Sequence, residues 1–217
     1  MPDVSANRAE GDVDKIVQRR FFRDQKAGVF VDVGAANPDY LSVSALYRSL
    51  GWRIIAIEPN PAFCEMHRKR GHEVLQYACG ERDADDVDFC IVDSHGERYQ
   101  NGRVSFESFS SLAIKESYAR IRPQMDVERI KVRLRRLDTI LQMHAPGLER
   151  IDILSVDVEG WELEVLAGLD FRKYRPKVLV IENLFDDPAY RARINAYGYL
   201  LWRFIAPNDV YVAREAW

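Results

Sequence analysis

Three apolar segments of strand length, each with an acidic residue at or near its end, most constrain the fold of this 217-residue chain. They read VFVDV, RIIAIEPN and IDILSVDVEG, and segments with helical spacing that stop at a glycine follow them. Strands that are apolar on both faces and joined by helices are typical of a parallel sheet covered on both sides. Ligands bind outside the carboxyl ends of such strands. The pattern predicts an α/β doubly wound domain with Asp32, Glu58 and Asp157 at its ligand-binding edge.

The turn after the first segment favours a nucleoside cofactor without phosphates. A dinucleotide site needs a GxGxxG turn, because the backbone must approach the pyrophosphate closely, whereas Gly34 is followed here by AANPD. Glu58 lies 24 positions after Gly34, where an acid can accept hydrogen bonds from a ribose diol. S-adenosylmethionine offers that diol, an adenine, an amino group and a carboxylate, but no phosphate. The loop therefore favours S-adenosylmethionine over NAD.

Four segments carry a resemblance to a known family: VFVDVGAANPDYLS, LGWRIIAIEPNP, IDILSVDVEGWELEVLAGL and VLVIENL. In this order, over roughly residues 29–185, they resemble the FkbM family of S-adenosylmethionine-dependent methyltransferases. The resemblance implies a Rossmann-like methyltransferase fold, with a seven-stranded, mostly parallel sheet, a terminal antiparallel strand pair and helices on both faces. YGYLLWRFI and DVYVAR, near the C-terminus, agree with that pair. Family members usually read DVGANxG in the first loop, where this chain has an extra alanine and Pro38-Asp39.

The resemblance also implies a cofactor site formed by the loops after the first three strands. The methionine end is expected near the first loop, the ribose at Glu58 and the adenine beside Pro59 and Asn60. The third predicted strand, HEVLQYACG, ends in residues that occupy the position flanking the adenine ring. The expected cofactor-binding residues are Asp32, Gly34, Ala35, Asn37, Glu58, Pro59, Asn60, Cys79 and Gly80.

The residues expected to face the reactive sulfonium and the acceptor are Asp157 and Glu159. They are the first candidates for a base that takes the acceptor proton. Because they lie two apart at a strand end, one can face the cleft while the other caps the next helix. His95, in an irregular segment, is the third candidate.

Four further residues are candidates for binding the acceptor. Ser110 and Ser111 belong to SFESFSSL, which resembles a serine-rich stretch of the family or is an ordinary loop. Glu182 and Asn183 end the VLVIENL strand at the same sheet edge, where they bind the acceptor or tie down a loop. No metal site is implied, since the acidic residues between positions 83 and 88 fit a solvated loop before a strand.

The expected organisation is an N-terminal helical segment, residues 1–24, followed by a single methyltransferase domain, residues 25–217. The N-terminal segment either packs on the sheet edge or mediates the formation of a homo-oligomer. An insertion at about residues 93–128 interrupts the α/β alternation and is expected to form a lid over the cleft. Its aromatic and basic side chains suit a sugar ring that carries phosphate or carboxylate.

Charge and composition narrow the choice of partners. The chain has 31 basic and 34 acidic residues, a net charge of −3, which gives no global attraction for nucleic acid. No apolar run approaches the roughly 20 residues that an integral membrane segment needs, and the N-terminus is too charged for a secretory signal. Three cysteines without metal-binding spacing fit reduced thiols in a cytoplasmic protein.

The expected function is O-methylation of a hydroxyl group on a sugar, glycolipid or natural product, with a small molecule or glycan as acceptor. The sulfonium is already a good electrophile, so alignment of the acceptor with the C–S bond is the main task. Two alternatives stay open. One is a non-catalytic domain that binds the cofactor or a partner, which the altered first loop favours, and the other is an NAD-dependent oxidoreductase.

Overall fold

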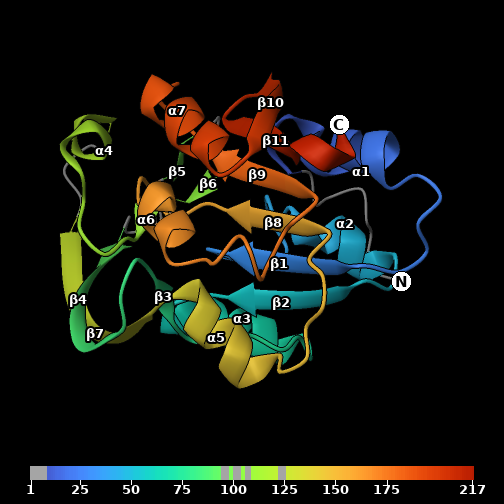
Figure 1. Cartoon of the computed structure of the whole chain (residues 1–217). Coiled ribbons are helices and arrows are strands. Elements are labelled where there is room, and N and C mark those ends of the chain that lie inside the picture. Colours follow the sequence, from blue (N-terminus) through green and yellow to red (C-terminus); the bar gives the residue numbers. More distant parts are fainter. Residues whose placement is uncertain (1–8, 94–97, 100–103, 106–108, 122–125) are drawn as a thin grey trace.

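Figure 1 shows one main sheet with helices on both faces in the computed structural model, which describes residues 9–93, 98–99, 104–105, 109–121 and 126–217. The strands of this sheet are β1 (Val29–Val33), β2 (Arg53–Ile57), β8 (Ile153–Val156), β9 (Val178–Glu182), β10 (Tyr199–Ile205) and β11 (Asn208–Ala213). Their order is β10-β11-β9-β8-β1-β2. β1, β2, β8 and β9 are parallel, and β11 pairs antiparallel with both β9 and β10. The predicted α/β fold with a terminal antiparallel pair is confirmed.

The prediction of seven strands in this sheet is wrong, because the third predicted strand leaves it after one bridge. Leu75 forms an isolated bridge with Ile57 at the end of β2. For the pairing with β2 to continue, the N–H of Tyr77 would have to donate to a carbonyl of that strand. It donates instead to the carbonyl of Leu75, at 3.1 Å. The chain then forms β3 (Ala78–Cys79), which pairs with β7 (Asp126–Arg135) instead.

β3 belongs to a second sheet of three strands, in the order β3-β7-β4, where β4 spans Ala84–Asp93. β4 and β7 are antiparallel, and Figure 1 shows them side by side at the left of the main sheet. The alternation predicted for β7 is confirmed, since Val132 and Leu134 are less exposed than Arg133 between them. A short pair, β5 (Arg98–Tyr99) and β6 (Val104–Ser105), lies within the predicted insertion.

Two apolar clusters pack the helices against the main sheet. The helices are α1 (Val13–Phe21), α2 (Ser44–Ser49), α3 (Pro61–Lys69), α4 (Glu116–Ile121), α5 (Leu137–His144), α6 (Glu162–Ala167) and α7 (Pro188–Ala196), with 3-10 turns η1 (Glu10–Asp12) and η3 (Arg214–Ala216). Val31 and Val33 of β1 point into the cluster with α5, α6 and α7, whereas Phe30 points into the cluster with α1 and α2. Helices therefore cover both faces, as predicted.

The N-terminal segment packs on a face of the main sheet rather than along its edge. Val13, Val17 and Phe22 are buried in the same cluster as Phe30 and Trp52, and Phe22 packs edge-on against Trp52 at 5.2 Å. This places η1 and α1 over β1 and its neighbours. The segment thus becomes part of the wall around the ligand-binding edge.

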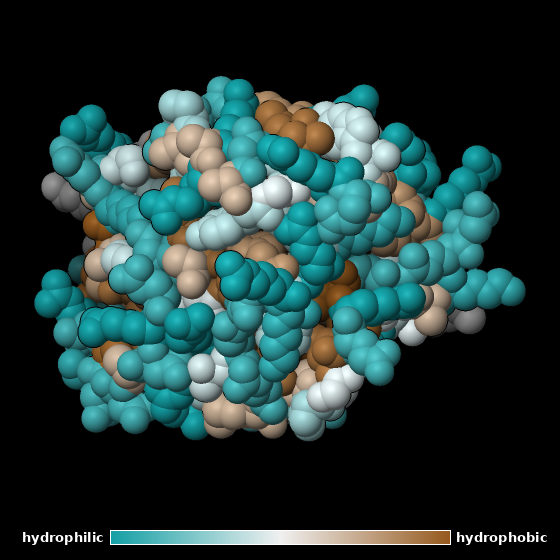
Figure 2. Space-filling model, in the orientation of Figure 1, coloured by the Kyte–Doolittle hydropathy of each residue, from teal (hydrophilic) through white to brown (hydrophobic). Residues whose placement is uncertain are grey.

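The outer surface offers little apolar area in the view of Figure 2, where hydrophobic side chains form small separate patches among hydrophilic ones. None of the described helices is long and apolar enough to cross a membrane. Cys64, Cys79 and Cys90 are buried free thiols.

Candidate functional site

The candidate site lies at the carboxyl edge of the main sheet, where the strand order reverses between β1 and β8. One row of neighbours runs across four strands, because Val33 pairs with Ile57 and with Val156, and Val156 pairs with Ile181. The residue that follows this row is Gly34 after β1, Glu58 after β2, Asp157 after β8 and Glu182 at the end of β9. The register therefore places three carboxylates and one glycine side by side, in the position that parallel sheets use for ligands.

Gly34 allows the turn after β1 to touch the turn after β8. Its φ is +83°, and a Cβ at this position would overlap the carbonyl oxygen of Asp157. The N–H groups of Gly34 and Ala35 both donate to the carbonyl of Ile57, at 3.0 and 3.2 Å. Ala36, the second alanine of this loop, adopts a φ of 39°. The loop thus closes tightly onto β2 and β8.

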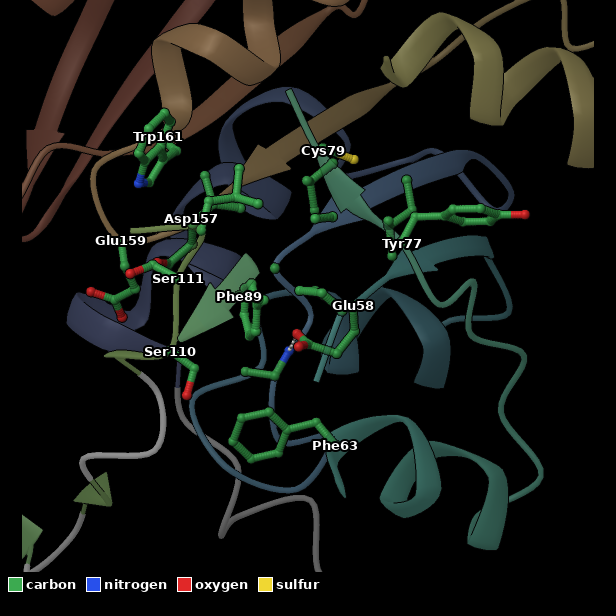
Figure 3. Close-up of a pocket in the computed structure, with 18 residues that line it drawn as sticks. Glu58, Phe63, Tyr77, Cys79, Phe89, Ser110, Ser111, Asp157, Glu159 and Trp161 are labelled. Carbon is green, nitrogen blue, oxygen red and sulfur yellow. Dashed lines mark hydrogen bonds between the residues drawn. The ribbon is translucent and has the colours of Figure 1, made fainter. Parts of the chain in front are cut away.

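Two adjoining cavities open at this edge, and they share Gly34, Ala36, Phe63, Asp157 and Glu159. The first encloses about 620 Å³, part of it open to solvent, and Figure 3 shows Glu58, Asp157 and several aromatic side chains around it. The second, of about 880 Å³, extends towards α2 and the N-terminal segment. Loops from β1, β2, β8 and β9 therefore enclose one continuous site.

Glu58 is held in place by two backbone amides. Its carboxylate accepts the N–H of Ala36 at 2.9 Å and the N–H of Asn60 at 2.7 Å, and only 5% of the residue is exposed. Burial raises the pKa of Glu58 to about 7; the two amide hydrogen bonds oppose this rise, and the charge of Asp32 adds to it. Glu58 lines the first cavity.

The other predicted cofactor residues divide into two groups. Asp32, Gly34, Ala35 and Asn37 line the second cavity, and Pro59 and Cys79 line the first.

Asn60 and Gly80 do not belong to the cavity lining among the described residues. The Asn60 side chain accepts the N–H of Ala62 at 2.9 Å and caps α3. Gly80 packs against Leu134, and its carbonyl lies against Gly168. The contacts of these two residues fix a helix start and a close approach of the backbone.

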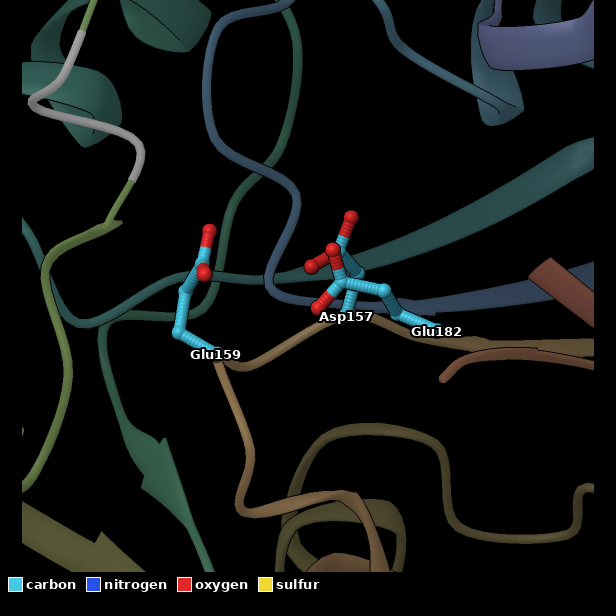
Figure 4. Close-up of side chains that lie close together, drawn as sticks. All are labelled: Asp157, Glu159 and Glu182. Carbon is cyan, nitrogen blue, oxygen red and sulfur yellow. The ribbon is translucent and has the colours of Figure 1, made fainter. Parts of the chain in front are cut away.

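Asp157, Glu159 and Glu182 form a carboxylate cluster at the boundary of the two cavities. One oxygen of each lies within 4.8 Å of one oxygen of the others, and Figure 4 shows their side chains at the ends of β8 and β9. Burial raises the pKa of all three carboxyl groups, and charge repulsion within the cluster raises those of Glu159 and Glu182 further. Asp157 keeps accessible surface because it faces the cavity.

Glu182 has a hydrogen-bond donor outside the cluster. Its carboxylate accepts the hydroxyl of Tyr118 at 3.1 Å. Glu159 is 7% exposed, has a φ of 59°, and its Oε2 is buried without a hydrogen-bond partner in the part of the chain that the structure describes. The expectation that one acid of this turn caps the next helix is not met by Glu159.

Glu162, which the sequence did not single out, holds this turn instead. Its Oε1 accepts the N–H groups of Val158 and Gly160, both at 3.0 Å, and its Oε2 accepts the hydroxyl of Tyr190 at 2.5 Å. The residue is fully buried. Glu162 therefore fixes the turn that presents Asp157 and Glu159. An acid in the first turn of a predicted helix was the only signal for it.

We expect Glu162→Ala to lower the free energy of unfolding by about 3 kcal/mol or more, because two buried amides and a hydroxyl lose their acceptor. Tyr190→Phe removes one of the three hydrogen bonds and should cost about 1 to 2 kcal/mol. Urea denaturation of both variants measures the difference. Equal effects of the two substitutions would show that the amide contacts to the turn contribute nothing.

Part of the predicted insertion lies against the site. Ser111 pairs with Cys90 of β4 through two backbone hydrogen bonds. Trp161 donates its indole N–H to the carbonyl of Ala113 at 2.9 Å, and Lys115 lies 3.2 Å from the carboxylate of Glu164. Together with the Tyr118 contact, these bonds tie residues 111–118 to β4, α6 and β9.

The predicted acceptor residues have different positions. Ser110 and Ser111 line the first cavity and Glu182 lines the second. The Asn183 side chain donates to Asp209 at 3.0 Å and accepts the N–H of Asp187 at 2.8 Å, so it ties down the loop before α7. His95 lies outside the described residues.

Several lining residues were not predicted from the sequence. Phe63 and Phe89 bring aromatic side chains to the first cavity, which Tyr77 also lines, and Glu10 and Asn208 line the second. Glu10 comes from the N-terminal segment and Asn208 from β11, so only the packing of distant segments brings them to the site. No local sequence signal distinguishes them.

Comparison with known proteins gives partial relatives, two of which are methyltransferases by name. Methyltransferase sdnD of Sordaria araneosa is 39% identical over 74 residues, which cover 31% of this chain and 29% of that protein. Methyltransferase 1 of Beauveria bassiana is 27% identical over 126 residues, 54% of this chain and 49% of that protein. AMB antimetabolite synthetase AmbE of Pseudomonas aeruginosa is 40% identical over 83 residues, 37% of this chain and 4% of that protein. The chain spans less than half the length of each.

A solved structure and a family description cover much more of the chain. The crystal structure of Methyltransferase FkbM from Methylobacillus flagellatus KT matches 96% of this chain and 48% of that one, with a TM-score of 0.52 and 14% identity, and supports the fold. The family described as Methyltransferase FkbM domain matches residues 32–201. Since this match covers most of the chain, the chain belongs to the FkbM methyltransferase family.

Proposed function

We propose that the protein uses S-adenosylmethionine to methylate a hydroxyl oxygen of a sugar, glycolipid or other natural product. The observation that carries this proposal is the charge of the two cavities. Their described lining contains six acids and neither lysine nor arginine. The acids are Glu10, Asp32, Glu58, Asp157, Glu159 and Glu182.

This charge favours S-adenosylmethionine over NAD. S-adenosylmethionine has a positive sulfonium and a positive ammonium group, and carboxylates attract both. NAD has a pyrophosphate, which needs backbone amides or basic side chains. The turn at Gly34 directs its first two N–H groups at Ile57 rather than into the cavity. An NAD-dependent oxidoreductase is therefore the weaker reading.

The two cavities suit the two ends of this cofactor. Glu58 can accept both ribose hydroxyls, since each carboxylate oxygen has a second lone pair beyond the amide bond it already accepts. Phe63 and Phe89 supply apolar and aromatic surface for the adenine. The methionine would then follow Gly34 into the second cavity, towards Asp32 and Asn37.

In the reaction the acceptor oxygen forms a bond to the methyl carbon while the electron pair of the C–S bond returns to sulfur. The acceptor proton must leave at or after the transition state. Asp157 and Glu159 lie where the two cavities meet and can receive it or pass it to water. The residues of the chain mainly align the two reactants and exclude water.

The acceptor class is inferred from the rim of the site. Trp161 lines the first cavity with Lys115 4.7 Å above its ring. Tyr118 packs edge-on against Phe185, which is exposed together with Leu184. Aromatic and apolar faces suit a sugar ring or an apolar natural product. One relative is named as an antimetabolite synthetase, which fits an acceptor of that kind.

Buried free thiols fit a reducing compartment such as the cytoplasm.

Calorimetric titration with S-adenosylmethionine, S-adenosylhomocysteine and NAD tests the cofactor. We expect micromolar binding of the first two and no binding of NAD. Transfer of a labelled methyl group to a panel of glycans and hydroxylated natural products then separates an enzyme from a binding domain. Binding of NAD alone would contradict the proposal, and cofactor binding without transfer to any acceptor would favour the non-catalytic alternative.

A further inference from the structure

The carboxylates of Asp157, Glu159 and Glu182 lie close together, and Glu159 and Glu182 are buried. Burying like charges together is costly unless a counter-charge or protons neutralise them. The second cavity is lined by five acids and, among its described residues, by neither lysine nor arginine. The proposed cofactor has two positive groups and one carboxylate, so its net charge is smaller than that of Asp157, Glu159 and Glu182 when all three are ionised. The cluster therefore has capacity for a further cation.

The spacing of the cluster fits the ligand shell of a hard divalent cation. Mg²⁺ holds oxygen atoms at about 2.1 Å and Ca²⁺ at about 2.3 to 2.6 Å, so oxygens on opposite sides are about 4.2 Å and about 4.6 to 5.2 Å apart. One oxygen from each of the three side chains lies within 4.8 Å of the others. Because 4.8 Å is wider than the shell of Mg²⁺ allows, the side chains must turn towards one another for all three to bind one ion.

An independent observation at Glu159 also points to a bound cation. Its Oε2 is buried and has no hydrogen-bond partner among the described residues, although only 7% of the residue is exposed. Glu159 lines both cavities, and Figure 4 shows its carboxylate extending to the same side of the sheet edge as the other two. Buried polar atoms are rarely left without a partner. A cation would satisfy this oxygen.

We propose that Asp157, Glu159 and Glu182 bind one divalent cation of the Mg²⁺ or Mn²⁺ type, and that this cation orients the acceptor hydroxyl. The site itself stands on the geometry, whereas the role towards the acceptor rests on the proposed function. The cation would accept a lone pair of the hydroxyl oxygen and favour loss of its proton to water. The oxygen then bonds to the methyl carbon as the C–S electron pair returns to sulfur.

The test measures Mn²⁺ binding to the chelator-treated full chain by the loss of the free-ion electron paramagnetic resonance signal. We expect one Mn²⁺ per chain, displaced by Mg²⁺, with a dissociation constant below about 1 mM. Asp157→Asn, Glu159→Gln and Glu182→Gln should each weaken binding by about tenfold or more. Glu65→Gln, which removes the same charge from the exposed surface of α3, should bind as the wild type does.

Thermal unfolding separates lost binding from lost folding. Without metal, Glu159→Gln should unfold at the same temperature as the wild type or higher, because the substitution relieves repulsion in the cluster. With Mn²⁺ the wild type should gain stability and the variant should not. A variant that is folded and stable but no longer responds to Mn²⁺ supports the site.

The outcomes distinguish the cation site from the proposed function. Absence of saturable Mn²⁺ binding, or unchanged affinity in all three variants, overturns the site. If S-adenosylhomocysteine still binds in that case, the methyltransferase proposal stands. Mn²⁺ binding that depends on the three carboxylates, without any binding of S-adenosylhomocysteine, supports the site and overturns its role towards the acceptor.

Discussion

Gly34→Ala is expected to lower the free energy of unfolding by about 4 kcal/mol or more, and to abolish cofactor binding in any protein that still folds. A left-handed backbone costs alanine about 1 kcal/mol. The larger cost comes from the carbonyl of Asp157, which the new Cβ would overlap. Neither backbone segment can move away easily, since Gly34 and Asp157 are both hydrogen-bonded to neighbouring strands. Urea denaturation and calorimetric titration with S-adenosylhomocysteine measure the two effects.

Gly51→Ala and Gly71→Ala are matched controls for this prediction. Both glycines have positive φ values, +81° and +72°, but an added Cβ would meet nothing within 4 Å at either position. The free energy of unfolding of these two variants should fall by only about 1 kcal/mol, the cost of the left-handed backbone. Both should bind the cofactor normally. If Gly34→Ala were no worse than these controls, the close approach of the two turns would not be important for stability.

Glu58→Ala is expected to weaken the binding of S-adenosylhomocysteine by at least about 100-fold. The substitution removes the acceptor of both proposed ribose hydrogen bonds and leaves two backbone amides without their partner. Glu58→Gln keeps the shape and one acceptor oxygen, so it should lose less affinity. Glu65→Ala, on the exposed face of α3, is the control and should bind normally. Unchanged binding in Glu58→Ala would show that the ribose does not bind at this position.

The high pKa of Glu58, about 7, also predicts how the protein responds to pH. Ribose hydroxyls donate to the ionised carboxylate, so cofactor affinity should fall by up to about tenfold between pH 8 and pH 6. Glu58→Gln has no proton to exchange at this position and should remove that part of the pH dependence. If cofactor affinity depends on pH equally in the wild type and in Glu58→Gln, the pH dependence arises from other groups.

Stability without cofactor should respond in the opposite sense. Because the pKa of Glu58 is raised by folding from an ordinary 4.5 to about 7, the folded chain binds the proton more tightly than the unfolded one. The stabilisation by the neutral form is complete below pH 4.5 and is lost as the pH rises through 7. Its size is about 3 kcal/mol at most. Denaturation of wild type and Glu58→Gln at pH 5 and pH 8 measures it.

The sequence predicted the strands, the order of strands and helices in the first half, and the edge at which ligands bind. Each of these follows from local patterns: apolar runs give buried strands, and acids after such runs lie at their carboxyl ends. Glu58 and Asp157 were placed correctly at that edge for this reason. The alternation in β7 was also local and correct. The helix α7 was not predicted, although Asp187 and Pro188 are favourable cap and first-turn residues.

Long-range pairing decided what local patterns could not. HEVLQYACG has the composition of a strand, yet a choice between two partners moved Ala78 and Cys79 from β2 to β7. Asn60 and Asn183 were predicted at the site because of their neighbours in the chain, but their side chains bond to the backbone and to Asp209. Sequence position fixes where a residue lies along a strand, and not where its side chain finds hydrogen-bond partners.

By itself the sequence determined an α/β methyltransferase domain with acids at the ends of its parallel strands. Only the tertiary structure decided that Asp157, Glu159 and Glu182 converge within 4.8 Å, and that Glu10 joins them from the N-terminal segment. The physical reason is that strand ends are set by local propensity and burial. The distance between residues far apart in the chain is set by sheet register and by how the helices pack on the sheet.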